Sequence, residues 1–120
     1  MVRIRRHAEN GNPVALRVLG SVYEFGHYGL EPSPVEGVRL YQRAADLGNA
    51  EAMLFLAMSY DHGVGIERDE KKAVKYYRMA ADRGVARAQK NLGTCFFLGE
   101  GVPEDVAEAL RLWKLAAAQG

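Results

Sequence analysis

The 120-residue sequence has few of the residues that catalysis and crosslinking require, with one cysteine, three histidines and one tryptophan. Cys95 is alone, so it cannot form an intrachain disulfide and the fold does not depend on oxidation. An excess of charge is also missing, because sixteen basic residues against fifteen acidic ones leave a formal charge of +1. This balance gives no global attraction toward nucleic acid or an anionic membrane, and neither is expected as a partner.

Long apolar runs are missing as well. No stretch is long and uncharged enough to cross a membrane, and Met1 to Asn10 lack the unbroken apolar segment of a secretory signal. A hydrophobic content of 48% with 26% charged residues is typical of a globular chain and excludes a disordered one. We therefore predict a soluble cytoplasmic protein. A secreted or periplasmic location stays open as an alternative, for the case that the sequence is an excerpt whose signal was removed.

The sequence does contain one pattern of residues that occurs three times. Residues 49–84 align with residues 85–120 without a gap, and residues 12–48 align with both once an extra residue is allowed in their middle. The alignment pairs Ala52 with Ala88, Leu56 with Leu92, Gly63 with Gly99, Gly65 with Gly101, Asp69 with Asp105, Tyr77 with Trp113, and Gly84 with Gly120. A fixed period of this length is typical of stacked helical units that each touch only their neighbours.

The middle copy predicts a helical hairpin. Small and apolar residues from Asn49 onward recur at the spacing of one helix face, so a first helix is expected over residues 49–62. Gly63 and Gly65 then break this helix, and Asp69 is placed to cap a second one. A hairpin this short leaves one apolar flank exposed to water, and stacking on the next hairpin covers that flank.

The first copy carries its own start signals. Asn12 precedes a proline at the first helical position, and Ser33 with Glu36 forms a Ser-x-x-Glu capping box, in which each residue satisfies a backbone donor of the other. Residues 1–11 align with the second half of a repeat. The sequence thus predicts an all-α solenoid with a half-repeat helix in residues 1–11 and antiparallel helical hairpins in residues 12–48, 49–84 and 85–120.

The third copy resembles the Sel-one-like repeat (SLR) family, whose helical hairpins are related to the tetratricopeptide repeat. The family pattern is met by Ala88, Leu92, Gly93, Phe96, Gly99, Gly101, Val102, Asp105, Ala109, Trp113, Ala116, Ala117 and Gly120. The resemblance implies a right-handed superhelix that acts as an adaptor or scaffold between proteins. Some secreted bacterial members with regularly spaced cysteine pairs are associated with binding or hydrolysing β-lactams. This chain lacks those pairs, so a β-lactam hydrolase is only a remote alternative.

The resemblance also implies where a partner binds, because the first helices of such repeats line the concave surface. The candidate positions lie on the side of each first helix opposite its inward face: Val14, Arg17, Val18, Ser21 and Phe25; Glu51, Leu54, Phe55, Met58 and His62; and Arg87, Lys90, Asn91, Thr94 and Leu98. This surface runs from apolar in the first copy to basic in the third, which suits an amphipathic or acidic peptide. The leading hypothesis is therefore a non-enzymatic scaffold that binds a peptide or protein segment there.

Two alternatives to a partner-binding surface stay open, one for the apolar residues of the middle copy and one for the ends of the chain. Leu54, Phe55 and Met58 are covered either by a partner or by the adjacent first helices. Alternatively, the chain is a structural unit whose open ends associate with other copies. The end residues are Ile4 and His7 at one end and Val106, Leu110 and Trp113 at the other.

The residues able to support catalysis or metal binding are scattered. His7, His27 and His62 lie at unrelated offsets, so no pair has the close spacing of a metal site. Cys95 falls near the edge of the inward face and is expected to be a buried thiol. The Gly-x-Gly pairs join helix to helix and lack the third glycine of a dinucleotide-binding loop. We therefore expect no catalytic, cofactor-binding or metal-binding residue and no enzyme activity.

Overall fold

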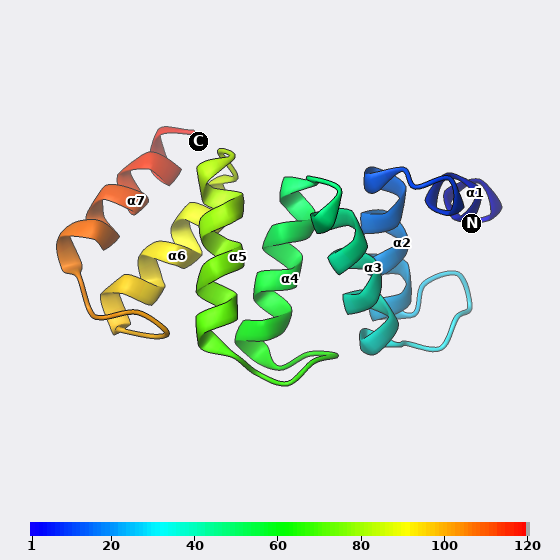
Figure 1. Cartoon of the computed structure of the whole chain (residues 1–120), viewed down its shortest axis with the longest axis horizontal. Coiled ribbons are helices and arrows are strands. Elements are labelled where there is room, and N and C mark those ends of the chain that lie inside the picture. Colours follow the sequence, from blue (N-terminus) through cyan, green and yellow to red (C-terminus); the bar gives the residue numbers. More distant parts are fainter. Residues whose placement is uncertain (120) are drawn as a thin grey trace.

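The computed structural model describes residues 1–119, which form seven helices and no strand. The helices are α1 (Val2–Glu9), α2 (Pro13–Phe25), α3 (Pro34–Asp46), α4 (Ala50–His62), α5 (Glu70–Asp82), α6 (Ala86–Leu98) and α7 (Val106–Ala118). They follow one another along a molecule of 47 × 28 × 22 Å, from α1 at one end to α7 at the other (Figure 1). The predicted all-α solenoid of three hairpins preceded by a single helix is confirmed. Gly120, the predicted closing glycine of the third copy, lies outside the described residues.

Capping side chains fix where α2, α3, α4, α5 and α7 begin. Asn49 accepts a hydrogen bond from the backbone N–H of Ala52 at 2.8 Å, and Asp69 accepts one from Lys72 at 3.0 Å. Equivalent caps are made by Asn12, Ser33 and Asp105. The first helix of the middle copy therefore starts at Ala50, and Asn49 stands outside it as the cap.

The capping box predicted at Ser33 is only half formed. Ser33 Oγ accepts from the backbone N–H of Glu36 at 3.3 Å, but the N–H of Ser33 donates to the carbonyl of Tyr23 at 2.6 Å rather than to the Glu36 side chain. The later hairpins repeat this bond, from Asp69 to Tyr60 and from Asp105 to Phe96. The second helix of each hairpin is thus attached to the first through the donor that a capping box would use.

The two glycines of each later turn have different tasks. Gly99 ends α6 in the left-handed conformation, with φ of +70°. Gly101 also has a positive φ, and it faces the backbone at the start of α5, where an added Cβ would lie 2.6 Å from the carbonyl oxygen of Glu70. Gly65 makes the same approach to Pro34 at the start of α3. The second glycine therefore serves the contact between successive hairpins as well as the turn.

One hydrophobic core runs through all three hairpins. Its largest fully buried side chains are those of Leu16, Tyr41, Met53, Leu56, Tyr77 and Leu92. Alanines with no exposed surface lie on the second helix of one hairpin and on the first helix of the next, namely Ala44 and Ala52, then Ala80 and Ala88. These small side chains let α3 approach α4 and α5 approach α6, so each hairpin covers the apolar flank of its neighbour.

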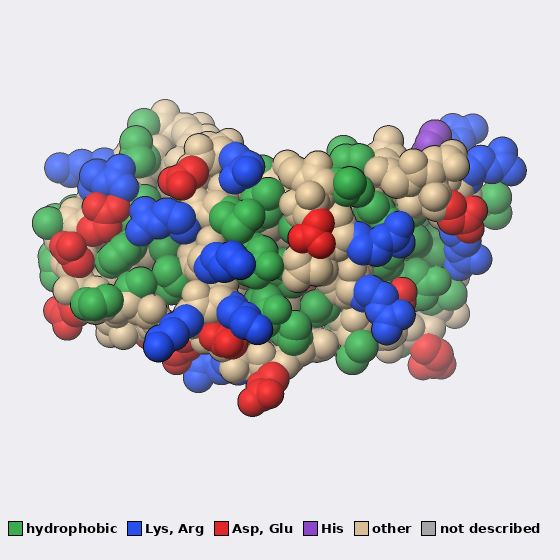
Figure 2. All heavy atoms as spheres, in the orientation of Figure 1, with side chains coloured by type: hydrophobic (Ala, Val, Ile, Leu, Met, Phe, Trp, Pro, Cys, Tyr) green, Lys and Arg blue, Asp and Glu red, His purple; other side chains and the backbone are tan. Residues whose placement is uncertain are grey.

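Basic side chains gather over α5 on the face seen in Figure 2. Helix α5 carries the exposed residues Lys71, Lys72 and Lys75. Lys72 and Lys75 lie over the rings of Tyr60 and Tyr76, at 5.5 and 5.2 Å from the ring centroids, and the two rings stack at 5.9 Å. Two of these lysines therefore already have aromatic partners within the chain.

Candidate functional site

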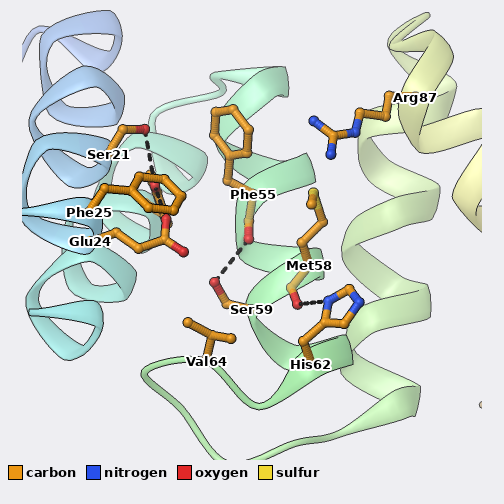
Figure 3. A pocket seen from close by; sticks show the side chains of 10 residues that line it. Ser21, Glu24, Phe25, Phe55, Met58, Ser59, His62, Val64 and Arg87 are labelled. Atoms are coloured by element: carbon orange, nitrogen blue, oxygen red, sulfur yellow. Dashed lines mark hydrogen bonds between the residues drawn. The ribbon is translucent and has the colours of Figure 1, made fainter. Parts of the chain in front are cut away.

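A hollow of about 330 Å³ opens between α2, α4 and α6, the first helices of the three repeats (Figure 3). This central hollow is lined by Ser21, Glu24, Phe25, Tyr41, Phe55, Met58, Ser59, His62, Val64 and Arg87. The lining includes six of the predicted surface residues, which are Ser21, Phe25, Phe55, Met58, His62 and Arg87. Side chains from all three repeats therefore meet in one place.

The apolar wall of the central hollow comes from Phe25, Phe55 and Met58, with Val64 at the turn after α4 (Figure 3). Phe25 is 63% exposed, whereas Phe55 and Met58 are half-buried. The ring of Tyr41 packs behind Phe55, with 5.4 Å between the ring centroids. Because Tyr41 is itself buried, the aromatic wall is held in position by the core.

The polar wall is a hydrogen-bond network around Tyr41. The phenol of Tyr41 donates to Glu24 Oε2 at 2.6 Å, and its oxygen lies 3.0 Å from Ser21 Oγ. Burial, together with the bond to Glu24, raises the pKa of Tyr41 well above its ordinary value, so the phenol stays a neutral donor. The carboxylate of Glu24 is thereby held at the α2 side of the hollow.

The second repeat contains the same acid–tyrosine pair, and the third replaces it. Tyr77 donates to Asp61 Oδ2 at 3.0 Å, and burial with the nearby Asp61 charge raises the pKa of Tyr77. The equivalent residues of the third repeat are Phe97 and Trp113, whose ring centroids lie 5.4 Å apart. The indole N–H of Trp113 donates instead to the backbone carbonyl of Lys90 at 3.1 Å. The third repeat has thus replaced the acid–tyrosine hydrogen bond by an aromatic contact and a hydrogen bond to the backbone.

Sequence reasoning missed four residues of the central hollow, which are Glu24, Tyr41, Ser59 and Val64. A signal existed for Glu24 and Tyr41, because an acid and a tyrosine recur at the same two positions of the next repeat. Ser59 lies beside the inward face of α4 and Val64 lies in a turn. Only the path of the chain in three dimensions brings these two to the hollow.

A second hollow, of about 650 Å³, lies between α6 and α7. It contains the predicted residues Arg87, Lys90 and Thr94, together with Trp113. Arg87 lines both this second hollow and the central one. The predicted basic end of the surface is therefore adjacent to its apolar part.

The remaining predicted positions do not join these hollows. Val14 and Val18 line a separate hollow near α1, together with the predicted end residues Ile4 and His7. Arg17 pairs with Glu51 at 3.5 Å, Asn91 is half-buried and Leu98 is exposed. At the other end, Val106 and Leu110 are 45% and 47% exposed and Trp113 is half-buried. Association through the two ends stays a prediction.

Leu54 does not belong to the surface. It is 4% exposed and forms part of the hydrophobic core. Helix α4 lies between two neighbouring repeats and is apolar on nearly every side, so the positions beside its inward face are covered by adjacent helices. Leu54 is therefore covered within the chain, and the helices that pack most extensively on α4 are the second helices α3 and α5 rather than the adjacent first helices of the alternative left open, whereas Phe55 and Met58 stay half-buried.

His62 and Cys95, whose side chains could take part in chemistry, both have contacts that serve the fold. His62 Nδ1 lies 2.9 Å from the backbone carbonyl of Met58 at the end of α4. Cys95 is buried, and burial raises the pKa of its thiol to about 12. Residues 1–119 contain no cluster of three or more His, Cys, Asp or Glu side chains arranged to hold a metal ion. In the same range no helix is long and apolar enough to cross a membrane.

The architecture defines a class of protein, a solenoid of α-helical hairpins with hollows along its first helices. The family follows from the sequence, since the Sel1 repeat model matches residues 13–49, 50–85 and 86–120, and the chain belongs to this family. Sel1 repeat proteins are generally non-catalytic scaffolds for protein interactions.

Solved structures place the chain among Sel1 repeats. It is similar to c5321, a protective antigen of uropathogenic Escherichia coli with an SLR fold, at 35% identity over 98% of this chain and 25% of that chain, with a TM-score of 0.94. A Sel1 repeat protein from Oxalobacter formigenes is 34% identical over 92% of this chain and 45% of that chain, with a TM-score of 0.88. The chain thus spans a quarter of the first protein and under half of the second.

A more distant relative shares the fold alone. Cysteine-rich protein B of Helicobacter pylori is 18% identical over 98% of this chain and 89% of that chain, with a TM-score of 0.76. No curated protein matches the chain.

Proposed function

We propose that this chain is a scaffold or adaptor that binds a peptide or protein segment on the concave surface of α2, α4 and α6. The observation that carries the proposal is the convergence of Phe25, Phe55 and Met58, from two repeats, on the central hollow (Figure 3). Phe25 is 63% exposed, so much of its apolar surface is available to a partner. The general role of Sel1 repeats as interaction scaffolds supports the proposal.

The central hollow suits one large apolar side chain of a partner. Its volume of about 330 Å³ lies at the lower end of ligand pockets, which range over about 300–1,000 Å³. Burial of one such side chain contributes about 1.5–3 kcal/mol, which corresponds to a roughly 10- to 150-fold gain in affinity. Buried Tyr41 already holds the Phe55 ring in place. Little of this gain in affinity is therefore lost to fixing the Phe55 side chain when a partner binds.

A selection from a phage-displayed library of random peptides, carried out on the folded chain, tests the proposal. The affinities of the selected peptides are then measured by fluorescence polarisation for wild type, Phe25→Asp and Phe55→Asp. Each substitution removes an aromatic ring and puts a charge into the apolar wall, so the expected loss of affinity is at least ~10-fold.

Tyr28→Asp is the matched control, because Tyr28 is a 70% exposed aromatic residue near Phe25 that does not line the central hollow. Circular dichroism must show the same helix content in all the variants. Unchanged affinity in both phenylalanine variants, an equal loss in Tyr28→Asp, or a library without enriched peptides would contradict the proposal.

A further inference from the structure

Arg87 connects two hollows of the proposed binding surface. The central hollow on one side of it contains Phe55 and Met58, and the second hollow contains Lys90 and Trp113. In Figure 3 the side chain of Arg87 extends from α6 toward Phe55 and Met58 on α4. One bound segment can therefore pass over the guanidinium group of Arg87 and occupy both hollows.

Arg87 and Lys90 are positive charges without an Asp or Glu partner among residues 1–119. Both residues are exposed, and no Asp or Glu oxygen within residues 1–119 lies within 4.0 Å of their side-chain nitrogens. On the first helix of the first repeat, by contrast, Arg17 is paired with Glu51. Among the cations of the first-helix surface, the two on α6 are thus the ones available to a ligand carboxylate, which would gain an ion pair that residues 1–119 do not make for themselves.

Glu24 gives the central hollow an opposite charge on its other wall. The hydrogen bond from Tyr41 holds its carboxylate in place. In Figure 3 Glu24 and Arg87 point into the hollow from opposite sides, with Phe55 and Met58 between them. An anionic group is repelled near Glu24 and attracted near Arg87, so the acidic part of a ligand is directed toward α6.

We propose, on the basis of the proposed function, that the partner is an acidic peptide segment with one bulky apolar residue. The apolar side chain lies between Phe25, Phe55 and Met58, and Asp or Glu residues of the segment bind Arg87 and Lys90. An extended chain advances about 3.3 Å per residue, so the acidic residues follow within a few positions of the apolar one. The order of apolar and acidic groups on the ligand then matches their order along the surface.

Nucleic acid is the rival anionic partner. Its phosphates repeat along the whole strand, so they would also meet Glu24 in the central hollow, and Arg87 and Lys90, the Lys and Arg residues that line the two hollows, would neutralise few of them. An acidic peptide instead confines its negative charge to the α6 end. A peptide is therefore the partner that fits both walls.

A charge-swap experiment tests this inference. A selected peptide is synthesised with its own acidic residues and again with each of them replaced by Lys, and both forms are titrated against wild type and Arg87→Glu by fluorescence polarisation. Wild type should prefer the acidic form by at least ~10-fold, and Arg87→Glu should prefer the lysine form. Lys71→Glu is the control, because this exposed residue of α5 changes the net charge equally but lines neither hollow.

Several results would overturn the inference. These are selected peptides that lack acidic residues, a preference that survives Arg87→Glu, and a reversal that Lys71→Glu produces equally. In each case a loss of affinity in Phe25→Asp or Phe55→Asp that Tyr28→Asp does not share still upholds the proposed function, whereas unchanged binding in both phenylalanine variants contradicts both proposals. A single-stranded oligonucleotide that binds through Arg87 but independently of Phe25 would assign the surface to nucleic acid instead.

Discussion

Replacing Gly101 by alanine tests how one repeat is attached to the next. Gly101 has a φ of +74°, and an added Cβ would lie 2.6 Å from the carbonyl oxygen and 2.8 Å from the carbonyl carbon of Glu70. These are backbone atoms at the first residue of α5, so they cannot rotate away as a side chain would. The left-handed conformation costs alanine about 1–2 kcal/mol, and the overlap with α5 adds about 1–3 kcal/mol. The expected loss in the free energy of unfolding is therefore about 2–5 kcal/mol.

Gly84→Ala separates the two costs. Gly84 has a similar φ of +84°, but a Cβ there would meet no atom within 4 Å, so only the conformational cost of about 1–2 kcal/mol applies. Urea unfolding followed by far-ultraviolet circular dichroism gives both free energies, provided that the dependence on urea is the same in the two variants. Gly65→Ala, whose Cβ would overlap the backbone of Pro34, should behave like Gly101→Ala. Equal destabilisation by Gly84→Ala and Gly101→Ala would refute the proposed contact between repeats.

Two further predictions concern buried titratable groups. Burial raises the pKa values of Tyr41 and Tyr77 above the ordinary value of 10.0, so the unfolded chain releases these protons first. The free energy of unfolding should therefore be unaffected by these groups below about pH 10 and fall as the pH rises above it, and a flat profile in alkaline urea titrations would contradict this. Burial likewise raises the pKa of Cys95 to about 12, so iodoacetamide should modify the folded chain near neutral pH far more slowly than the unfolded chain. Mass spectrometry of quenched samples measures both rates, and equal rates would show that the thiol is accessible.

The repeat pattern was sufficient to predict the solenoid, because each of its signals is local. Asn49 and Asp69 are capping residues that act within one helical turn, and the positive φ of Gly63 depends on the turn it ends. The helical spacing of small and apolar residues identified the face that each helix buries. The predicted all-α hairpins follow from these signals without knowledge of any contact between distant residues.

At particular residues the prediction from the sequence was wrong or incomplete, because contacts between helices decided the outcome. Leu54 lies opposite the inward face in the sequence pattern, yet it is buried in the solenoid, where α4 packs on α3 of the first repeat as well as on α5 of its own hairpin. The motif pairs the backbone N–H of Ser33 with the Glu36 side chain, but in the solenoid that N–H donates to the carbonyl of Tyr23 on α2, and Glu36 pairs with Arg39 instead. Gly101 reads as a turn residue in the sequence, whereas its approach to Glu70 depends on how neighbouring hairpins stack.

The sequence by itself determined the elements, their order and the inward face of each helix, because these depend on residues a few positions apart. Only the tertiary structure decided which variable positions share a hollow. Phe25 ends α2, Phe55 lies in the middle of α4 and Arg87 is near the start of α6, so the central hollow crosses the three helices diagonally. Two pairs of equivalent positions, Ser21 with Met58 and Phe25 with His62, share this hollow, whereas the third repeat contributes Arg87 to it and not the equivalent Thr94 and Leu98, so the third repeat is offset from the other two. That offset places an apolar wall and an unpaired cation in the same groove.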